Sequence, residues 1–407
     1  MTIEWYVCSF VDVFGQAGSL AVPAAGFDDA VANGVPFDGS ALEGRARVLE
    51  SDMRLRPDPA SIVELESGYA QVWCTVVDPS GAPWPVDPRA ALIQVLDHVA
   101  DFAQGIRFSA ELEFYLLGSD GEAVDRARYY SSLDGRGADV VLDAASTLAS
   151  RGVPIAAVHS EAGPGQYELD IGLLAPLAFA DAVIRTKDEL RRAARRNGLV
   201  VTFMARPLPD EPGSGLHVLQ SSAVLLGDDG KLTDDGRAFV AGQLAHAPGL
   251  CALAASTVNS YRRLHAGPEA PGAAVWGHVN RAALIRIGAG PAAVAGIEFR
   301  GADPTANAHL LVAGLVATGA AGVEENLALA PPNEESTAGF DPSSDSQRFA
   351  PLPRTLDDAL DAFALDDVLA DAFDPRLIQV LLDGRRAETE AFRAHVTTWE
   401  RDWYRDS

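Results

Sequence analysis

Apolar and polar residues alternate in the segment RFSAELEFYLLG at 107–118, and this period of two predicts a β-strand. Every second residue from Phe108 to Leu116 is apolar, whereas Glu111 and Glu113 lie on the opposite face. One face therefore suits a core, and the other carries two carboxylates side by side. The same alternation also fits an exposed edge strand, and the segment alone does not separate the two alternatives.

Two β-branched and aromatic segments near the start of the chain also predict strands. They are EWYVCSFVDVFG at 3–14 and YAQVWCTVVD at 69–78, and turn-forming residues flank both. The following segment, 86–105, has Asp-Pro-Arg before apolar residues at i, i+3 and i+4 and ends in Gly. This arrangement predicts a helix that begins near residue 88.

Helical patterns recur later in the chain. Residues 180–198 show apolar residues at helical spacing and end in Asn-Gly, which stops a helix. The stretch 325–354 is rich in Pro, Ser and acidic residues without a period and predicts a long surface loop. Two helical patterns follow it, and the last spans about 375–405. We therefore expect an α+β protein with a small β-rich domain, 1–99, and a larger mixed domain, 100–407.

Composition narrows the class of protein. The 407 residues are 48% hydrophobic and 22% charged, which is ordinary for a globular protein of two domains. The sequence contains no apolar run long enough for a membrane span and no signal-peptide pattern at its start, so we expect a cytoplasmic protein. The three cysteines are far apart and predict neither disulfides nor a zinc site.

The formal net charge of −25 argues against nucleic acid or an anionic membrane as a partner. The dense basic run RRAARR at 191–196 lies in the last turns of the helix predicted over 180–198. Basic side chains there stabilise the helix dipole, so we interpret the run as a solvated helix end.

Three further segments carry acidic or imidazole side chains on strand or turn patterns. In HSEAGPGQYELDIG, Glu161 precedes a Gly-Pro-Gly turn and Glu168 follows it, so the two carboxylates can converge. Glu298 shares one face of AGIEFRG with Arg300, and a Gly-Ser-Gly turn delivers His217. A single histidine is usually structural, but this one accompanies five glutamates.

Five carboxylates and one imidazole form a set of hard oxygen ligands with one nitrogen. Such a set favours Mg²⁺ or Mn²⁺ over zinc, and its size suits two divalent ions. Ions of this kind serve phosphoryl transfer because they neutralise charge on the transferred phosphate. The predicted ligands are Glu111, Glu113, Glu161, Glu168, His217 and Glu298.

A nucleotide would have to be held without a P-loop. The motif GxxxxGK[ST] does not occur, and Lys187 and Lys231 are the only lysines in the sequence. Arginines suited to forked contacts with phosphate or carboxylate occur in NSYRRLHAGPEAP and HVNRAALIRIG. They are Arg262, Arg263, Arg281 and Arg286.

Taken in order, these segments resemble the signatures of the glutamine synthetase family. The resemblance rests on ELEFYL, HSEAGPGQYELDIG, TFMARPLPDEPGSGLHVLQSS, NSYRRLHAGPEAP, NRAALIRI and IEFRGADPTANAHL. FVDVFG, PFDGSALEG and ESDMRLRPD resemble the β-grasp domain of that family, and 386–404 resembles its last helix. The resemblance implies a catalytic domain with an antiparallel sheet and helices, ATP as co-substrate, and rings of six subunits, often two stacked, with sites between subunits.

The resemblance also implies a role for each matching residue. One metal ion would be held by Glu113, Glu161 and Glu168, and the other by Glu111, His217 and Glu298. Arg263 and Arg300 would bind the carboxylates of a glutamate-like substrate. Arg281 and Arg286 would face the ATP phosphates, and Glu269 would help to remove a proton from the attacking nitrogen. The remaining implied contacts are Gly213 and Glu113 for the substrate, Ser221 for the nucleotide, and Asp38, Asp52 and Tyr129 for ammonium.

Several positions depart from the family pattern. Pro212 and Gly213 stand where Asn-Gly is usual, Leu219 replaces the second histidine of H-x-H, and Ala41 replaces a serine. Ala308 and His309 stand where Pro and Tyr are expected, and the run GAGPAAVAG at 288–296 lacks the basic residues that often precede the IEFR motif.

These departures leave all six predicted ligands and Glu269 in place, so we expect an altered substrate. The prediction is an ATP-dependent ligase that phosphorylates the side-chain carboxylate of glutamate or an analogue and couples it to ammonia or a small amine. The alternative is a catalytically impaired relative that binds nucleotide or amino acid as a regulator or scaffold, which the missing basic residues favour.

Overall fold

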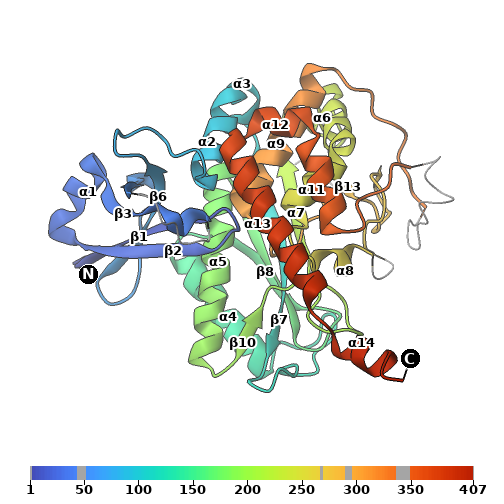
Figure 1. Ribbon diagram of the computed structural model, residues 1–407, viewed down its shortest axis with the longest axis horizontal. Coiled ribbons are helices and arrows are strands. Elements are labelled where there is room, and N and C mark those ends of the chain that lie inside the picture. The colour runs from blue at the N-terminus through green and yellow to red at the C-terminus, as the bar shows by residue number, and fades with distance from the viewer. Residues whose placement is uncertain (1, 44–51, 266–268, 289–295, 336–348, 407) are drawn as a thin grey trace.

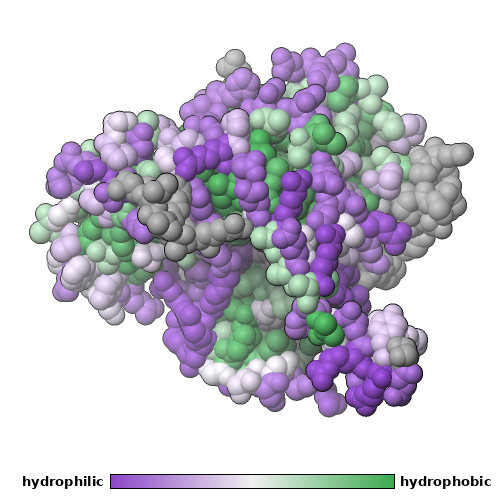
Figure 2. All heavy atoms as spheres, in the orientation of Figure 1, coloured by the Kyte–Doolittle hydropathy of each residue, from purple (hydrophilic) through white to green (hydrophobic). Residues whose placement is uncertain are grey.

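A computed structural model describes residues 2–43, 52–265, 269–288, 296–335 and 349–406. The described chain forms two β-sheets, and helices cover the larger one (Figure 1). Parts of the predicted loop at 325–354 and of the run GAGPAAVAG lie outside the described residues. Polar and charged residues cover most of the face seen in Figure 2, as the composition leads us to expect.

The N-terminal sheet forms because apolar residues alternate along its strands and bury a shared face around Leu55 and Val72. Both strands predicted near the start of the chain are present, and they pair in parallel at the centre of this sheet. In order across the sheet, the strands are β2 (Ala17–Pro23), β1 (Trp5–Val11), β6 (Tyr69–Val77), β4 (Asp52–Pro57) and β3 (Val35–Asp38), with β5 (Val63–Glu64) paired to β6. Short helical segments on this unit are η1 (Ala24–Gly26), α1 (Phe27–Asn33), η2 (Gly39–Glu43) and η3 (Pro59–Ser61).

The larger sheet is mostly antiparallel, and its strand order does not follow the chain. The strands in order are β12 (Trp276–Gly277), β13 (Ile285–Ile287), β14 (Ile297–Phe299), β11 (Leu216–Ser221), β7 (Arg107–Leu117), β9 (Gln166–Leu174) and β8 (Ile155–Ser160). β10 (Val200–Thr202) pairs with the end of β7. The sheet therefore brings segments from 107 to 299 side by side.

The register of this sheet gathers acidic side chains on one face. Glu111 on β7 lies opposite His217 on β11 and opposite Asp170 on β9. One step along the same face, Glu113 lies opposite Glu168, which in turn lies opposite His159 on β8. The reverse face of β7 is buried from Phe108 to Leu116, so the predicted alternation is confirmed and the edge-strand alternative is wrong.

Helices bury the reverse face of the larger sheet and surround the central helix α9. From residue 88 to the end of α9, the helices are α2 (Pro88–His98), α3 (Ala100–Ala103), α4 (Arg136–Ser150), α5 (Pro176–Arg196), α6 (Asp234–Ala245), α7 (Ala247–Ala254), α8 (Ser260–Leu264) and α9 (Ala308–Glu324). α5 packs on β7 and β9, and α9 contacts α2, α5, α6 and α7. No helix within the described ranges is long and apolar enough to cross a membrane.

Two helix predictions need correction. The segment 86–105 forms two helices, because Val99 leaves the helical conformation (φ −109°, ψ 32°) between α2 and α3. The C-terminal segment forms more helices than the two patterns predicted, because side-chain caps restart the chain at Asp366 and Thr397. These helices are α11 (Leu356–Ala364), α12 (Asp367–Ala372), α13 (Pro375–Ala394) and α14 (Thr398–Trp403), and the last one projects at the C-terminus in Figure 1.

A buried ion-pair network joins the N-terminal sheet to the helices. Arg89, at the start of α2, donates from Nη2 to Asp58 at 2.7 Å and from Nε and Nη2 to Asp181 on α5 at 3.1–3.3 Å. His309 on α9 contacts the same Asp181 carboxylate through Nε2 at 2.9 Å. Four segments therefore meet at one buried charge cluster. The predicted boundary between residues 99 and 100 stays a prediction.

Candidate active site

A polar cavity of about 160 Å³ opens on the acidic face of the larger sheet. Three of the acidic residues and both histidines come from β7, β8, β9 and β11, and the arginines come from the segment around β13 and β14. The other two acidic residues, Glu161 and Glu269, lie outside the strands. The lining residues are Glu111, Glu113, Tyr129, Tyr130, His159, Glu161, Glu168, His217, Glu269, Arg281, Arg286 and Arg300. The cavity therefore combines an acidic half with a basic half.

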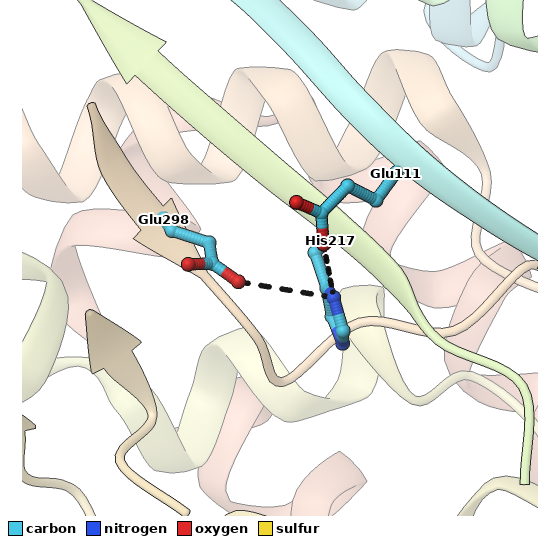
Figure 3. A group of neighbouring side chains, drawn as sticks. All are labelled: Glu111, His217 and Glu298. Atoms are coloured by element: carbon cyan, nitrogen blue, oxygen red, sulfur yellow. Dashed lines mark hydrogen bonds and ion pairs between the residues drawn. The ribbon is translucent and has the colours of Figure 1, made fainter. Parts of the chain in front are cut away.

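Glu111, His217 and Glu298 converge from three neighbouring strands (Figure 3). His217 Nδ1 lies 2.9 Å from Glu111 Oε2 and 3.8 Å from Glu298 Oε1. Burial, with Arg300 nearby, lowers the pKa of His217 to about 3, so its imidazole is neutral at pH 7. A neutral imidazole and two carboxylates whose ligand atoms lie within 4.8 Å of one another suit a divalent cation.

Glu113 points into the cavity and is held there by two donors. Its Oε2 accepts from the backbone N–H of Gly215 at 2.9 Å and from Gln166 Nε2 at 3.3 Å. Gln166 also donates to the carbonyl of Gly213 at 3.0 Å, so it links the carboxylate to the turn before His217. Gln166 lies at the start of β9 on the same face as Glu168, and the sequence motifs did not predict a role for it.

Glu161 and Glu168 flank a third side chain, His159. Burial, and then repulsion by Glu113, raises the pKa of Glu161 to about 7. Burial raises the pKa of Glu168 to about 8, although the hydrogen bond from His159 opposes this rise. Such pKa values are typical of buried carboxylates that crowd one another. Sequence reasoning did not assign His159 to the site, although it stands two residues before Glu161.

Arginines surround the buried carboxylate of Glu298 and the mouth of the cavity. Arg286 Nε lies 2.8 Å from Glu298 Oε2, and Arg300 Nη1 pairs with Glu298 Oε1. Arg281 Nη1 lies 3.4 Å from Glu269 Oε1, and both of these side chains are more than half exposed. Arg281 and Glu269 are therefore available to a molecule that enters the cavity.

Arg263 lies beneath His217 and is not among the residues that line the cavity. Its Nη2 donates to His217 Nε2 at 3.4 Å and to the carbonyl of Arg300 at 3.2 Å. Its Nη1 is buried and has no hydrogen-bond partner within the described part of the chain. A buried guanidinium nitrogen without an acceptor can bind a carboxylate that reaches it.

Three of the remaining predicted site residues, Asp38, Asp52 and Ser221, do not line the cavity. Asp38 and Asp52 face each other across β3 and β4 in the N-terminal sheet. Ser221 ends β11 opposite Arg107, at the far end of that strand from His217. Tyr129 does line the cavity. Within this chain, the structure therefore brings together the predicted metal ligands but not the predicted ammonium pocket.

The donor set fits a pair of hard divalent cations. Five carboxylates on β7, β9 and β14 share one sheet face, and Glu161 approaches them from the turn after β8. Asp170 Oδ1 is buried on this face without a hydrogen-bond partner within the described ranges. Clustered carboxylates of this kind become favourable when cations neutralise them.

Two protein-family models match the two parts of the chain. The model for the catalytic domain of glutamine synthetase matches residues 85–404, and the model for its β-grasp domain matches residues 2–79. The chain belongs to the glutamine synthetase family. Its fold, a β-grasp domain followed by the catalytic domain, is the fold of that family.

Curated members of the glutamine synthetase family match over nearly their full length. The glutamine synthetase of Halobacterium salinarum is 31% identical, with 99% of this chain and 93% of the relative covered. That of Mycobacterium tuberculosis is 33% identical over 96% and 93% of the two chains. These enzymes are ligases that form carbon–nitrogen bonds, and the present chain is a ligase of the same kind. Their names give no support to the regulator alternative.

Solved structures of the glutamine synthetase fold also match the entire chain. A structure titled "GmaS/ADP complex-Conformation 1" has a TM-score of 0.89 and 29% identity, and covers 100% of this chain and 97% of its own. A structure titled "Crystal structure of novel glutamine synthase homolog" has a TM-score of 0.82 and 28% identity over 98% and 96% of the two chains. Glutamine synthetases use ATP and divalent metal ions, which agrees with the donor set described above.

Gly213, which follows Pro212 in the turn before His217, has no room for a side chain. A Cβ there would lie 2.6 Å from the carbonyl oxygen of Ala205 and 2.7 Å from Arg263 Cγ. We expect Gly213→Ala to lower the free energy of unfolding by about 1–3 kcal/mol, because the turn or Arg263 must shift. Chemical denaturation measures this loss. Gly26→Ala, with no atom within 4 Å, is the matched control, and an equal effect of both changes would contradict the explanation.

Proposed function

We propose that the protein phosphorylates the side-chain carboxylate of glutamate or an analogue with ATP and then couples it to ammonia or a small amine. The products are an amide, ADP and phosphate. The observation that carries the proposal is the cavity itself, because its acidic half can hold cations and its basic half can hold phosphate and carboxylate groups.

The acidic half would hold two divalent cations. Glu113, Glu161 and Glu168 form one set of ligands, and the second set is Glu111, His217 and Glu298. Bound Mg²⁺ or Mn²⁺ supplies neutralisation of the charge that develops on the transferred phosphoryl group. The neutral state of His217 favours this role, since an imidazolium has no lone pair to offer.

The basic half would orient the two anionic substrates. Arg281 and Arg286 lie at the cavity wall and suit the ATP phosphates, while Ser221 would contact the nucleotide. Arg300 lines the same cavity, and Arg263 offers its unpaired Nη1 from below, so both suit the carboxylates of the acid. Gly213 brings the backbone close to Arg263 and would leave space for the substrate amino group.

The reaction has two steps. The carboxylate oxygen attacks the γ-phosphorus, ADP leaves, and an acyl phosphate forms. The neutral amine then attacks the carbonyl carbon, the C–O bond to phosphate breaks, and Glu269 accepts the proton from nitrogen. Glu269 is more than half exposed beside Arg281, which suits a group that meets an incoming amine.

The amine pocket would be completed by a second copy of the chain. Asp38 and Asp52 lie together on the N-terminal sheet, so a neighbouring subunit would contribute them as a pair, opposite Tyr129. We therefore propose rings of six subunits, or two such rings stacked, with each site between two subunits.

The test is phosphate release from ATP by the purified protein with Mg²⁺. Glutamate is combined in turn with ammonia, ethylamine, ethanolamine and polyamines, and the amide product is identified by mass spectrometry. We expect release with at least one pair, its loss after treatment with EDTA, and its recovery when Mg²⁺ or Mn²⁺ is added back. No release with any pair would contradict the proposed reaction.

A further inference from the structure

His159 on β8 occupies a central place in the cavity to which the proposed reaction assigns no role. Its Nε2 lies 3.0 Å from Glu168 Oε1, and its Nδ1 lies 3.5 Å from Glu161 Oε1. The two carboxylates come from different segments, since Glu168 lies on β9 and Glu161 begins the turn after β8. One imidazole ring therefore bridges two of the three proposed ligands of the first cation.

The ring of His159 is fixed by aromatic contacts. Tyr130 stacks on it, with ring centroids 4.5 Å apart and an angle of 27° between the planes, and Tyr129 meets it edge-on at 6.1 Å. Nδ1 also lies 3.2 Å from the carbonyl oxygen of Ser160. A ring held by stacking and by contacts at both nitrogens has little freedom to rotate.

The backbone is held in an uncommon conformation to place Tyr130 on the ring. Tyr130 has φ +54°, which bulky residues rarely adopt. Its N–H donates to the carbonyl of Ser160 at 3.1 Å, and Ser160 Oγ donates to the carbonyl of Arg128 at 2.8 Å. Two hydrogen bonds thus tie the turn that carries Tyr130 to the strand that carries His159. Conformations of this kind persist where the surroundings enforce them, commonly at functional sites.

A further carboxylate, that of Asp170, adds to the negative charge around Glu168. Asp170 follows Glu168 on the same face of β9, and ligand atoms of His159, Glu168 and Asp170 all lie within 4.8 Å of one another. Glu168 also lies opposite Glu113 on β7. Like charges on both sides repel the Glu168 carboxylate, and the contact with His159 holds it against this repulsion.

We propose that His159, held under Tyr130, is a positioning residue that sets the spacing and orientation of Glu161 and Glu168 for the first divalent cation. This inference rests on the proposed function, because it concerns one of the two cation sites. Groups that hydrogen-bond metal ligands typically change metal affinity by about 10- to 100-fold when they are removed. His159 acts through the two glutamates and needs no contact with the substrates.

The experiment is a titration of the full chain with Mn²⁺, in which electron paramagnetic resonance measures free ion. We expect wild type to bind two ions and His159→Ala to bind one of them at least about tenfold more weakly. Tyr130→Leu should lower the affinity for the same ion to a smaller extent. His159→Gln, which keeps a donor near the position of Nε2, should recover part of the affinity. His98→Ala removes an exposed histidine at the end of α2 and should bind like wild type.

The outcomes separate this inference from the proposed function. Two ions bound by His159→Ala with unchanged or tighter affinity would overturn the positioning role alone, since tighter binding would make His159 a competitor of the cation. A wild-type chain that binds no Mn²⁺ would overturn the cation sites and the positioning role together. Equal thermal unfolding midpoints of the variants and wild type show that weaker binding of the ion comes from the altered site and not from a loss of folded structure.

Discussion

Glu113→Ala is expected to lower the rate of amide formation by roughly a thousandfold, which corresponds to about 4 kcal/mol of transition-state stabilisation. The carboxylate of Glu113 points into the cavity under the control of Gly215 and Gln166. Its removal takes away a proposed cation ligand, and it also leaves the N–H of Gly215 without that acceptor. Steady-state release of ADP in the presence of acid and amine measures the loss.

The matched control for this change is Glu122→Ala. Glu122 is an exposed glutamate in the turn that follows β7, outside the cavity. Its replacement should leave the rate within about twofold of wild type, because exposed charges contribute little. Turnover retained by Glu113→Ala would remove Glu113 from the set of cation ligands.

Arg89→Ala should lower the free energy of unfolding by roughly 3–5 kcal/mol, the largest loss that we expect from one change outside the cavity. Arg89 is 2% exposed and pairs with Asp181, which is 4% exposed, and with Asp58, the N-cap residue of η3. Without Arg89, the charge of Asp181 stays buried with His309 as its remaining described partner. Urea denaturation followed by tryptophan fluorescence measures the loss.

Two comparisons make this expectation specific. Arg192→Ala removes an exposed arginine from α5, the helix that carries Asp181, and should change stability by no more than about 0.5 kcal/mol. The double change Arg89→Leu with Asp181→Leu should lower the free energy of unfolding less than Arg89→Ala does. The double change removes the Asp181 charge together with Arg89, so no unpaired charge stays buried. A single change that costs less than about 1 kcal/mol would show that the network does not stabilise the fold.

Alternation along single strands predicted much of the larger sheet and of its acidic face. The buried row from Phe108 to Leu116 and the outward direction of Glu111 follow from the period of two. The pairing of β7 with both β11 and β9 does not follow from that period, because neither strand adjoins β7 in the chain. The six ligands were therefore predicted from residue types on separate segments, and their division between two cations came from the family resemblance.

His159 shows why part of the site escaped prediction. A histidine on a strand of mixed character carries no periodic signal, and its place between Glu161 and Glu168 depends on the register of β8 against β9. The stacking of Tyr130 depends on a left-handed backbone conformation that no residue type in RARYYSS predicts. Contacts of this kind appear only when the tertiary structure is known.

The interruptions of the helices follow a similar rule. Apolar residues at helical spacing continue from 86 to 105 and from 375 to 405, so this pattern alone predicts one helix in each range. The actual ends depend on single residues, such as the Thr397 side chain that accepts from the N–H of Glu400. Caps act on one turn and are weaker signals than a repeated apolar face.

The two oxygens of Glu298 each face a guanidinium, one from Arg286 and one from Arg300. If Glu298 coordinated a cation, its ion pairs with Arg286 and Arg300 would weaken, because the same two oxygens make both kinds of contact. Occupancy of the proposed second cation site and the release of these arginines from Glu298 would therefore be thermodynamically linked, and the linkage would be reciprocal. An arginine released from Glu298 gains the capacity to hold an incoming anion, so binding of a cation by Glu298 would favour binding of an anion by Arg286 or Arg300.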